Sequence, residues 1–269
     1  MNRIAQAFHA LSKRGERAVI PYLTAGYPDW DTFLKVLEFL GEEGASMVEV
    51  GIPFSDPVAD GPVIQRASER ALAMGVTPKG ILERLKKRCR SKSGDEGAPT
   101  LPTIAMGYYN PILRYGVDRF AKEASEAGIS GIIVPDLPPE EAKELRAAAE
   151  RAGIATIFLV APTTPKERIA TIAEATTGFL YLVSIKGVTG TRLQGTGPII
   201  ERIETIRSVT DLPLCVGFGI SDASQARELS RHADGVIVGS ALIRAIDKDG
   251  EEGARKLIRE IAKAVNGQG

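Results

Sequence analysis

Short runs of apolar residues, rich in valine and isoleucine, recur along the whole chain. Most of them lack the polar alternation of a strand with one wet face, so we expect strands that are buried on both faces. The eight segments with this pattern are Val19–Leu23, Ser46–Ile52, Thr103–Tyr108, Gly131–Pro135, Ala155–Ala161, Gly178–Ser184, Pro213–Gly217 and Gly235–Gly239.

Between these runs, apolar residues stand three and four positions apart, which is the spacing of an amphipathic helix. Asp31–Glu42, Glu140–Ala152 and Ser221–Arg231 show this spacing. Alternating strands and helices favour right-handed crossovers and a parallel sheet. Eight such units predict the α/β class and a closed (β/α)8 TIM barrel, with residues 1–269 forming a single domain. An open doubly wound sheet is the alternative, but no G-x-G-x-x-G follows the first strand.

The composition is that of an ordinary globular protein, with 43% hydrophobic and 25% charged residues. The 34 basic and 34 acidic residues balance, so bulk charge gives no attraction to nucleic acid. No apolar run approaches the ~20 residues of a membrane span, and the segment from Met1 to Gly15 lacks the core of a secretory signal. Two cysteines argue against a disulfide framework, so we expect a cytoplasmic protein. Two histidines argue against a metal site built on imidazoles.

The active site of such a barrel lies at the carboxyl ends of its strands. Glycine-rich turns follow the last three predicted strands, and phosphate binding requires exposed backbone N–H groups with little steric hindrance. Gly190, Gly219 and Gly239 allow that approach, and Ser240 adds a hydroxyl at the start of the last helix. Tight turns without a ligand are the alternative. Lys186 follows the sixth predicted strand beside a glycine-rich loop, which favours a solvated side chain, and the Schiff-base lysine of an aldolase is the alternative.

Glu49 is the first acidic candidate. It lies between two valines in the second strand, so it shares a face with Met47 and Gly51. We therefore expect its carboxyl group inside the barrel, where desolvation raises the pKa as proton transfer requires. A buried ion pair is the alternative.

Asp60 and Asp56 stand on the loop that follows. Asp60 is a second candidate for chemistry, with capping of a helix that begins at Pro62 as the alternative. For Asp56, formation of a turn beside Pro57 is an alternative to any role in a site.

The segment from Val48 to Gln65, V-E-V-G-I-P-F-S-D-P-V-A-D-G-P-V-I-Q, closely resembles the signature of the tryptophan synthase α subunit family. The resemblance covers essentially the whole chain and includes P-Y-L-T-A-G-Y-P, Y-Y-N-P, G-V-T-G, G-F-G-I-S and G-S-A. It implies retro-aldol cleavage of indole-3-glycerol phosphate to indole and glyceraldehyde 3-phosphate. Glu49 then matches the general acid for C3 of the indole, and Asp60 matches the carboxylate that binds the indole N–H.

The same resemblance assigns the other site residues. The positions that match the lining of the family's indole pocket are Tyr22, Met106, Ile133 and Tyr181. The positions that match the family's phosphate site are Gly190, Phe218, Gly219, Gly239 and Ser240. The residues that match those tied to closure of the loop after the sixth strand are Asp136 and Thr189.

The resemblance also implies a partner, a pyridoxal-phosphate-dependent β subunit that receives indole within an αββα heterotetramer. Asp56, Pro57, Asn110 and Pro111 would face that subunit. Because the pyridoxal phosphate belongs to the partner, we expect no cofactor and no metal in this chain. Three alternatives stay open: a stand-alone lyase that uses the same residues, another phosphate-binding barrel isomerase or synthase, and a barrel that has lost catalysis and only activates its partner.

Overall fold

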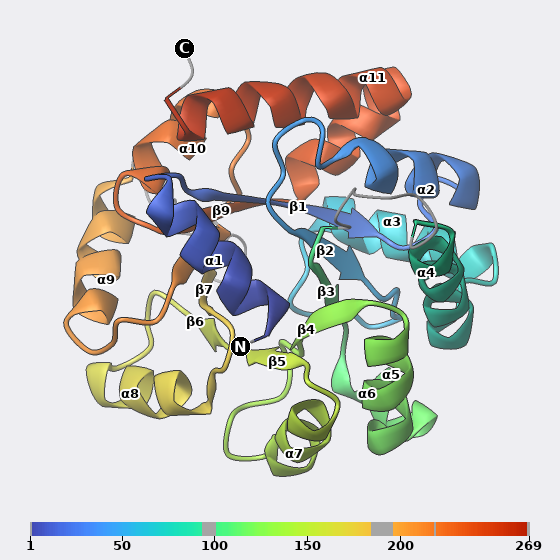
Figure 1. Cartoon of the computed structure of the whole chain (residues 1–269), viewed down its shortest axis with the longest axis horizontal. Helices are drawn as coiled ribbons and strands as arrows, with labels where there is room; N and C mark the ends of the chain where they lie inside the picture. The colour runs from blue at the N-terminus through green and yellow to red at the C-terminus, as the bar shows by residue number, and fades with distance from the viewer. Residues whose placement is uncertain (1, 93–100, 184–195, 218, 268–269) are drawn as a thin grey trace.

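The computed structural model describes residues 2–92, 101–183, 196–217 and 219–267. In these ranges one parallel sheet is surrounded by helices (Figure 1). The strands are β1 Ala18–Thr24, β2 Val48–Gly51, β3 Thr103–Met106, β4 Ile129–Ile133, β5 Ala155–Ile157, β6 Leu159–Val160, β7 Leu180–Val183, β8 Leu214–Gly217 and β9 Gly235–Val238. The helices are α1 Arg3–Lys13, α2 Trp30–Phe39, α3 Pro62–Ala73, α4 Pro78–Lys92, α5 Tyr109–Tyr115, α6 Val117–Glu126, α7 Lys143–Arg151, α8 Lys166–Ala175, α9 Gly197–Arg207, α10 Ala223–Ser230 and α11 Ser240–Val265.

The sheet closes on itself through the segment that contains β5 and β6. The strand order is β5-β4-β3-β2-β1-β9-β8-β7-β6, so these two consecutive strands stand at its opposite ends. Only Phe158 separates them, and its carbonyl accepts a hydrogen bond from the Tyr181 N–H at 3.1 Å. β5 pairs with β4, and β6 pairs with β7. The predicted (β/α)8 barrel is therefore confirmed, with its fifth predicted strand divided in two.

Strand side chains alternate between the barrel interior and the layer under the helices. Val48 and Val50 pack in the outer cluster, whereas Met47 packs in the inner cluster with Ile20 and Ile104. Because both faces of each strand are covered, the strands need no polar alternation.

Helix α1 covers the amino end of the barrel. Its residues Ile4, Phe8 and Leu11 are buried in the inner cluster, and the helix lies across the near end of the barrel in Figure 1. The side chain of Asn2, just before the helix, donates to the Thr177 carbonyl at 3.3 Å. This arrangement leaves the carboxyl ends of the strands as the end available for a site.

Local signals explain several helix boundaries. The side chain of Asp29 accepts from the Thr32 N–H at 2.8 Å at the start of α2, and Asp222 caps α10 in the same way. Pro62 is the first residue of α3, as expected for a proline without an N–H donor. The glycine, serine and proline content of Ser91–Thr100 predicts a loop, but helix α4 continues to Lys92 and therefore includes the first two residues of this segment.

The two histidines, His9 and His232, are both exposed. Both cysteines are free thiols. In the part of the chain that the structure describes, no helix combines the length and apolar character needed to span a membrane.

Candidate active site

Glu49 lies on the inner face of β2, with its carboxyl group buried in the barrel. The residue is 1% exposed, and neither carboxyl oxygen has a hydrogen-bond partner among the described residues. Burial, and then the charge of Asp60, raise the pKa of Glu49 to about 8. The expected inward orientation is confirmed, because Met47 on the same face packs in the inner cluster. Among the described residues no cation pairs with this carboxylate, so nothing there supports the alternative of a buried ion pair.

Asp60 stands on the loop between β2 and α3, where Tyr108 holds it. The Tyr108 hydroxyl donates to Asp60 Oδ2 at 3.2 Å and accepts from the Ala59 N–H at 2.9 Å. Burial raises the pKa of Asp60 to about 6, while the Tyr108 hydrogen bond lowers it. The alternative role of a helix cap is wrong, because Gly61 is the N-cap residue of α3.

Tyr108 itself is a site residue that the sequence argument does not identify. The residue is 3% exposed, and its ring stacks on Phe54 with the ring centres 5.1 Å apart. It follows β3, so the only sequence signal is its position at a strand end inside the Y-Y-N-P motif.

Two interior glycines make room for two tyrosines. A Cβ on Gly51 would lie 2.1 Å from the Tyr22 hydroxyl oxygen, and a Cβ on Gly217 would lie 2.3 Å from Tyr181 Cε2. Burial raises the pKa of both tyrosines, and the charges of Asp60 and Glu49 raise it further. Tyr22 and Tyr181 therefore border the same space as the two carboxyl groups.

The other expected pocket residues also lie in the barrel interior. Met106 is paired in register with Gly51 on one side and with Ile133 on the other. Met106 packs against both the inner cluster and the small cluster around Tyr22, and Ile133 is fully buried. The apolar side chains thus share the interior with the two carboxyl groups.

The described part of the expected phosphate site lies after β8 and β9. Gly219 is exposed with φ +62°, a backbone conformation that favours glycine. Gly239 is the N-cap residue of α11, and Ser240 is the first residue of that helix. A Cβ on Gly239 would lie 3.5 Å from Tyr22, so this turn borders the Tyr22 side of the site. Lys186, Thr189, Gly190 and Phe218 lie outside the described residues.

The remaining expected residues lie on loops around the site. Asp136 Oδ1 accepts from the Tyr109 N–H at 2.9 Å, which links the end of β4 to the start of α5. Asn110 and Pro111 lie in the first turn of α5. Asp56 is exposed and its carbonyl accepts from the Val58 N–H at 2.9 Å, whereas Pro57 is buried.

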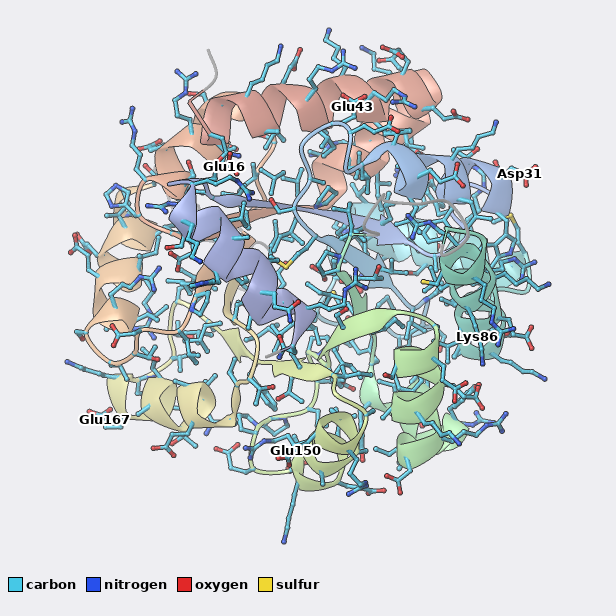
Figure 2. All side chains as sticks on the ribbon, viewed as in Figure 1. Glu16, Asp31, Glu43, Lys86, Glu150 and Glu167 are labelled. Atoms are coloured by element: carbon cyan, nitrogen blue, oxygen red, sulfur yellow. The ribbon has the colours of Figure 1, made fainter. Side chains whose placement is uncertain are left out.

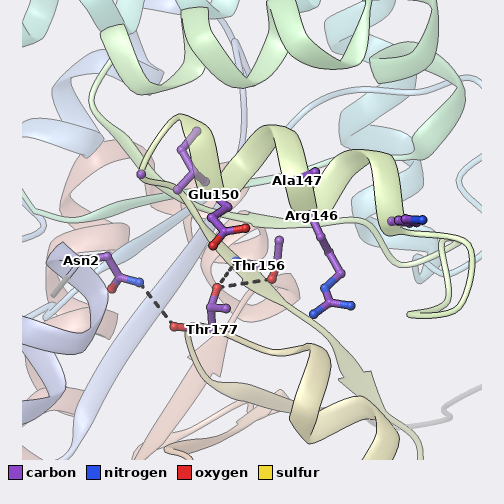
Figure 3. Close-up of a pocket in the computed structure, with 9 residues that line it drawn as sticks. Asn2, Arg146, Ala147, Glu150, Thr156 and Thr177 are labelled. Carbon is purple, nitrogen blue, oxygen red and sulfur yellow. Dashed lines mark hydrogen bonds between the residues drawn. The ribbon is translucent and has the colours of Figure 1, made fainter.

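A separate cavity of about 460 Å³ opens at the other end of the barrel (Figure 3). It is lined by Asn2, Lys143, Arg146, Ala147, Glu150, Gly153, Ile154, Thr156 and Thr177. Because Thr156 lies near the start of β5, this cavity is at the amino ends of the strands, opposite the carboxyl groups of the site. Its polar atoms are not among the buried unpartnered atoms of the described residues, so nothing in it demands a ligand.

Carboxyl groups whose pKa is raised by burial are costly to keep, and enzymes place them where protons are transferred. A (β/α)8 barrel that holds two such groups at the carboxyl ends of its strands is an enzyme of the acid–base class. The sequence profile of the family described as tryptophan synthase alpha chain matches residues 8–268. The chain belongs to the tryptophan synthase alpha chain family.

Individual relatives agree with this assignment. The chain is 48% identical to the tryptophan synthase alpha chain of Citrifermentans bemidjiense, over 92% of this chain and 90% of the relative. It is 45% identical to that of Burkholderia lata, over 100% and 98%. Its fold matches the crystal structure of tryptophan synthase subunit alpha from Legionella pneumophila with a TM-score of 0.89 and 37% identity, over 98% of both chains. It also matches an aminoacrylate- and BRD0059-bound tryptophan synthase from Mycobacterium tuberculosis with a TM-score of 0.87 and 38% identity, over 98% of both chains.

Proposed function

We propose that this chain cleaves indole-3-glycerol phosphate to indole and glyceraldehyde 3-phosphate, with Glu49 and Asp60 as its acid–base groups. The observation that carries the proposal is the Glu49 carboxyl group, buried without a partner and with its pKa raised to about 8. Such a group is protonated near neutral pH and can both give and take a proton.

Glu49 would act twice. The bond between indole C3 and the side-chain carbon breaks only after C3 is protonated, so Glu49 first gives its proton to C3. Its carboxylate then takes the proton of the hydroxyl on the adjacent carbon, and that carbon becomes the aldehyde. The electrons of the broken bond return to the ring, and Glu49 ends in its starting protonation state.

Asp60 would stabilise the intermediate between these steps. Protonation of C3 leaves a positive charge on the ring nitrogen, and a carboxylate that accepts the indole N–H stabilises that charge. Burial raises the pKa of Asp60 to about 6, below that of Glu49, and the hydrogen bond from the Tyr108 hydroxyl lowers it. The two carboxyl groups therefore hold different protonation states at neutral pH, as their separate roles require.

The rest of the site would bind the two ends of the substrate. Tyr22, Met106, Ile133 and Tyr181 supply an apolar wall for the indole ring. Gly219, Gly239 and Ser240 would bind the phosphate, together with Gly190 and Phe218. Asp136 and Thr189 would control closure of the loop after the sixth strand unit.

A β subunit that carries pyridoxal phosphate would receive the indole, and this chain would carry no cofactor. The docking surface would include Asp56, Pro57, Asn110 and Pro111. Two exposed apolar side chains support this location: Val58 is 81% exposed and Leu113 is 51% exposed, one on each of these segments. We place the reaction in the cytoplasm, in keeping with the two free thiols.

Incubation of the purified chain with indole-3-glycerol phosphate tests the proposal. We expect indole and glyceraldehyde 3-phosphate in equal amounts, formed slowly by the chain alone and faster with a β subunit. Fast release that a β subunit leaves unchanged would favour a stand-alone lyase. No product from the folded chain under either condition would refute the assigned substrate.

A further inference from the structure

The Tyr22 hydroxyl is a polar group inside what the sequence presents as an apolar pocket. Tyr22 is 5% exposed and lies on β1, where its Cα is paired in register with Glu49 on β2. Neighbouring in-register side chains of a parallel pair point to the same face, so both enter the barrel interior.

The ring of Tyr22 reaches along the barrel, over the strand that carries Glu49. Its hydroxyl oxygen would lie 2.1 Å from a Cβ on Gly51, which is two residues beyond Glu49 on the same face of β2. The hydroxyl therefore lies on the carboxyl-end side of Glu49, where a substrate enters. The absence of a side chain at Gly51 creates the room for it.

Among the residues that the structure describes, no group accepts the proton of this hydroxyl. Thr24 Oγ1 donates to the Tyr22 oxygen at 3.4 Å, so this contact uses the oxygen as an acceptor and fixes its orientation. No described residue accepts the Tyr22 proton, because both Glu49 oxygens lack partners and the side-chain donor to Asp60 is Tyr108. A buried O–H whose proton lacks an acceptor and a buried carboxyl group without a partner, both judged among the described residues, are neighbours in register and indicate a ligand that satisfies both.

We propose that Tyr22 is a further catalytic residue, whose hydroxyl donates a hydrogen bond to the oxygen that Glu49 deprotonates. The inference rests on the proposed function. That substrate oxygen must lie within hydrogen-bond reach of Glu49. Tyr22 is the in-register neighbour of Glu49, and its O–H proton has no acceptor among the described residues. Negative charge grows on the oxygen as its proton leaves, so this hydrogen bond is strongest in the transition state and accelerates the chemical step.

The test compares Tyr22→Phe with the unmodified chain. The substitution keeps the ring, and we expect kcat for indole release to fall about tenfold with a small change in KM. Tyr115→Phe is the matched control, because its hydroxyl contacts Glu123 on the outer helices and its loss leaves the site intact. Thr24→Val keeps the hydroxyl of Tyr22 but removes the bond that orients it, so kcat falls by a smaller factor.

A substrate analogue separates this role from simple packing. Indole joined to a propyl phosphate has the ring and the phosphate but no side-chain hydroxyl, so Tyr22→Phe and the unmodified chain should bind it equally. Weaker binding of the analogue by Tyr22→Phe would assign the hydroxyl a structural role and overturn the proposal. So would equal kcat values, or a shift of the acid limb of the pH profile, which would assign the hydroxyl to a carboxylate. If the unmodified chain releases no indole, the proposed function itself fails, and this outcome is distinct from all of these.

Discussion

Tyr108 donates a hydrogen bond to Asp60 across 48 positions of sequence, at 3.2 Å. The same hydroxyl accepts from the Ala59 N–H, so one side chain at the end of β3 holds both the carboxylate and the backbone of the loop after β2. The link ties the position of Asp60 to the barrel scaffold and stabilises its ionised form.

Tyr108→Phe should therefore destabilise the ionised form of Asp60. Loss of the hydrogen bond raises the pKa of Asp60 above about 6, so the acid limb of the kcat/KM profile moves to higher pH. At neutral pH we expect kcat/KM to fall about tenfold. The control is Tyr109→Phe, which removes the neighbouring hydroxyl. A Tyr108→Phe profile that superimposes on that of the unmodified chain would show that Tyr108 does not act through Asp60.

Glu49→Gln should stabilise the folded protein above neutral pH. The pKa of Glu49 rises from 4.5 to about 8 on folding, so its contribution to stability is full below about 4.5 and is lost as pH rises through about 8. The unmodified chain should lose roughly 2–4 kcal/mol of unfolding free energy across this window that the variant keeps. Urea denaturation at acidic, neutral and alkaline pH measures the difference. Glu174→Gln, on the exposed face of α8, serves as control, and identical pH dependence in both variants would count against a desolvated Glu49.

The contribution of Glu43 to stability should depend on pH in the opposite direction to that of Glu49. The residue is 7% exposed and lies in the turn after α2 (labelled in Figure 2). Its carboxylate accepts from Arg259 Nε at 2.7 Å and from Arg255 Nη1 at 2.9 Å, which joins this turn to α11. The hydrogen bonds from Arg259 and then Arg255 lower the pKa of Glu43, so its stabilisation is present above the unfolded pKa and is lost as pH falls through the folded one.

Glu43→Gln should accordingly lower the free energy of unfolding at neutral pH by about 1 kcal/mol or more, with little change at strongly acidic pH. Its KM and kcat should match those of the unmodified chain, because Glu43 is far from the carboxyl end of the barrel. Glu42→Gln is the control, with a side chain that is 74% exposed. Equal losses of stability in the two variants would argue against a special role for Glu43.

Gly51→Ala should displace Tyr22. The new Cβ would lie 2.1 Å from the Tyr22 hydroxyl oxygen and 2.5 Å from Cζ, so the ring must move. We expect kcat/KM to fall about a hundredfold from the misplaced ring, in a protein that still folds. Gly41→Ala provides the control, because its Cβ meets Leu101 at an ordinary 3.5 Å. Activity near that of the control would show that the Tyr22 position is not critical.

The strands and the direction of Glu49 could be predicted because both depend on local alternation. Val48 and Val50 mark the outer face of β2, and the intervening Glu49 must then face inward. Ile4, Phe8 and Leu11 in α1 also have helical spacing, but the polar residues between them make this signal weak.

Features that depend on distant partners could not be predicted in this way. The break at Phe158 interrupts a continuous apolar run, and it exists because the segment changes its partner from β4 to β7. The contact between Tyr108 and Asp60 depends on the order of β2 and β3 in the barrel, and no local pattern in either segment indicates it.

The most direct test of the central claim is indole release from indole-3-glycerol phosphate by Glu49→Gln and Asp60→Asn, measured beside Glu174→Gln in the presence of a β subunit. If Glu49 and Asp60 carry the chemistry, both variants stay folded and lose about a hundredfold or more in kcat, while the control keeps full activity. Release by Glu49→Gln at the rate of the control would contradict the account, because the reaction would then not require a proton donor at the position of Glu49.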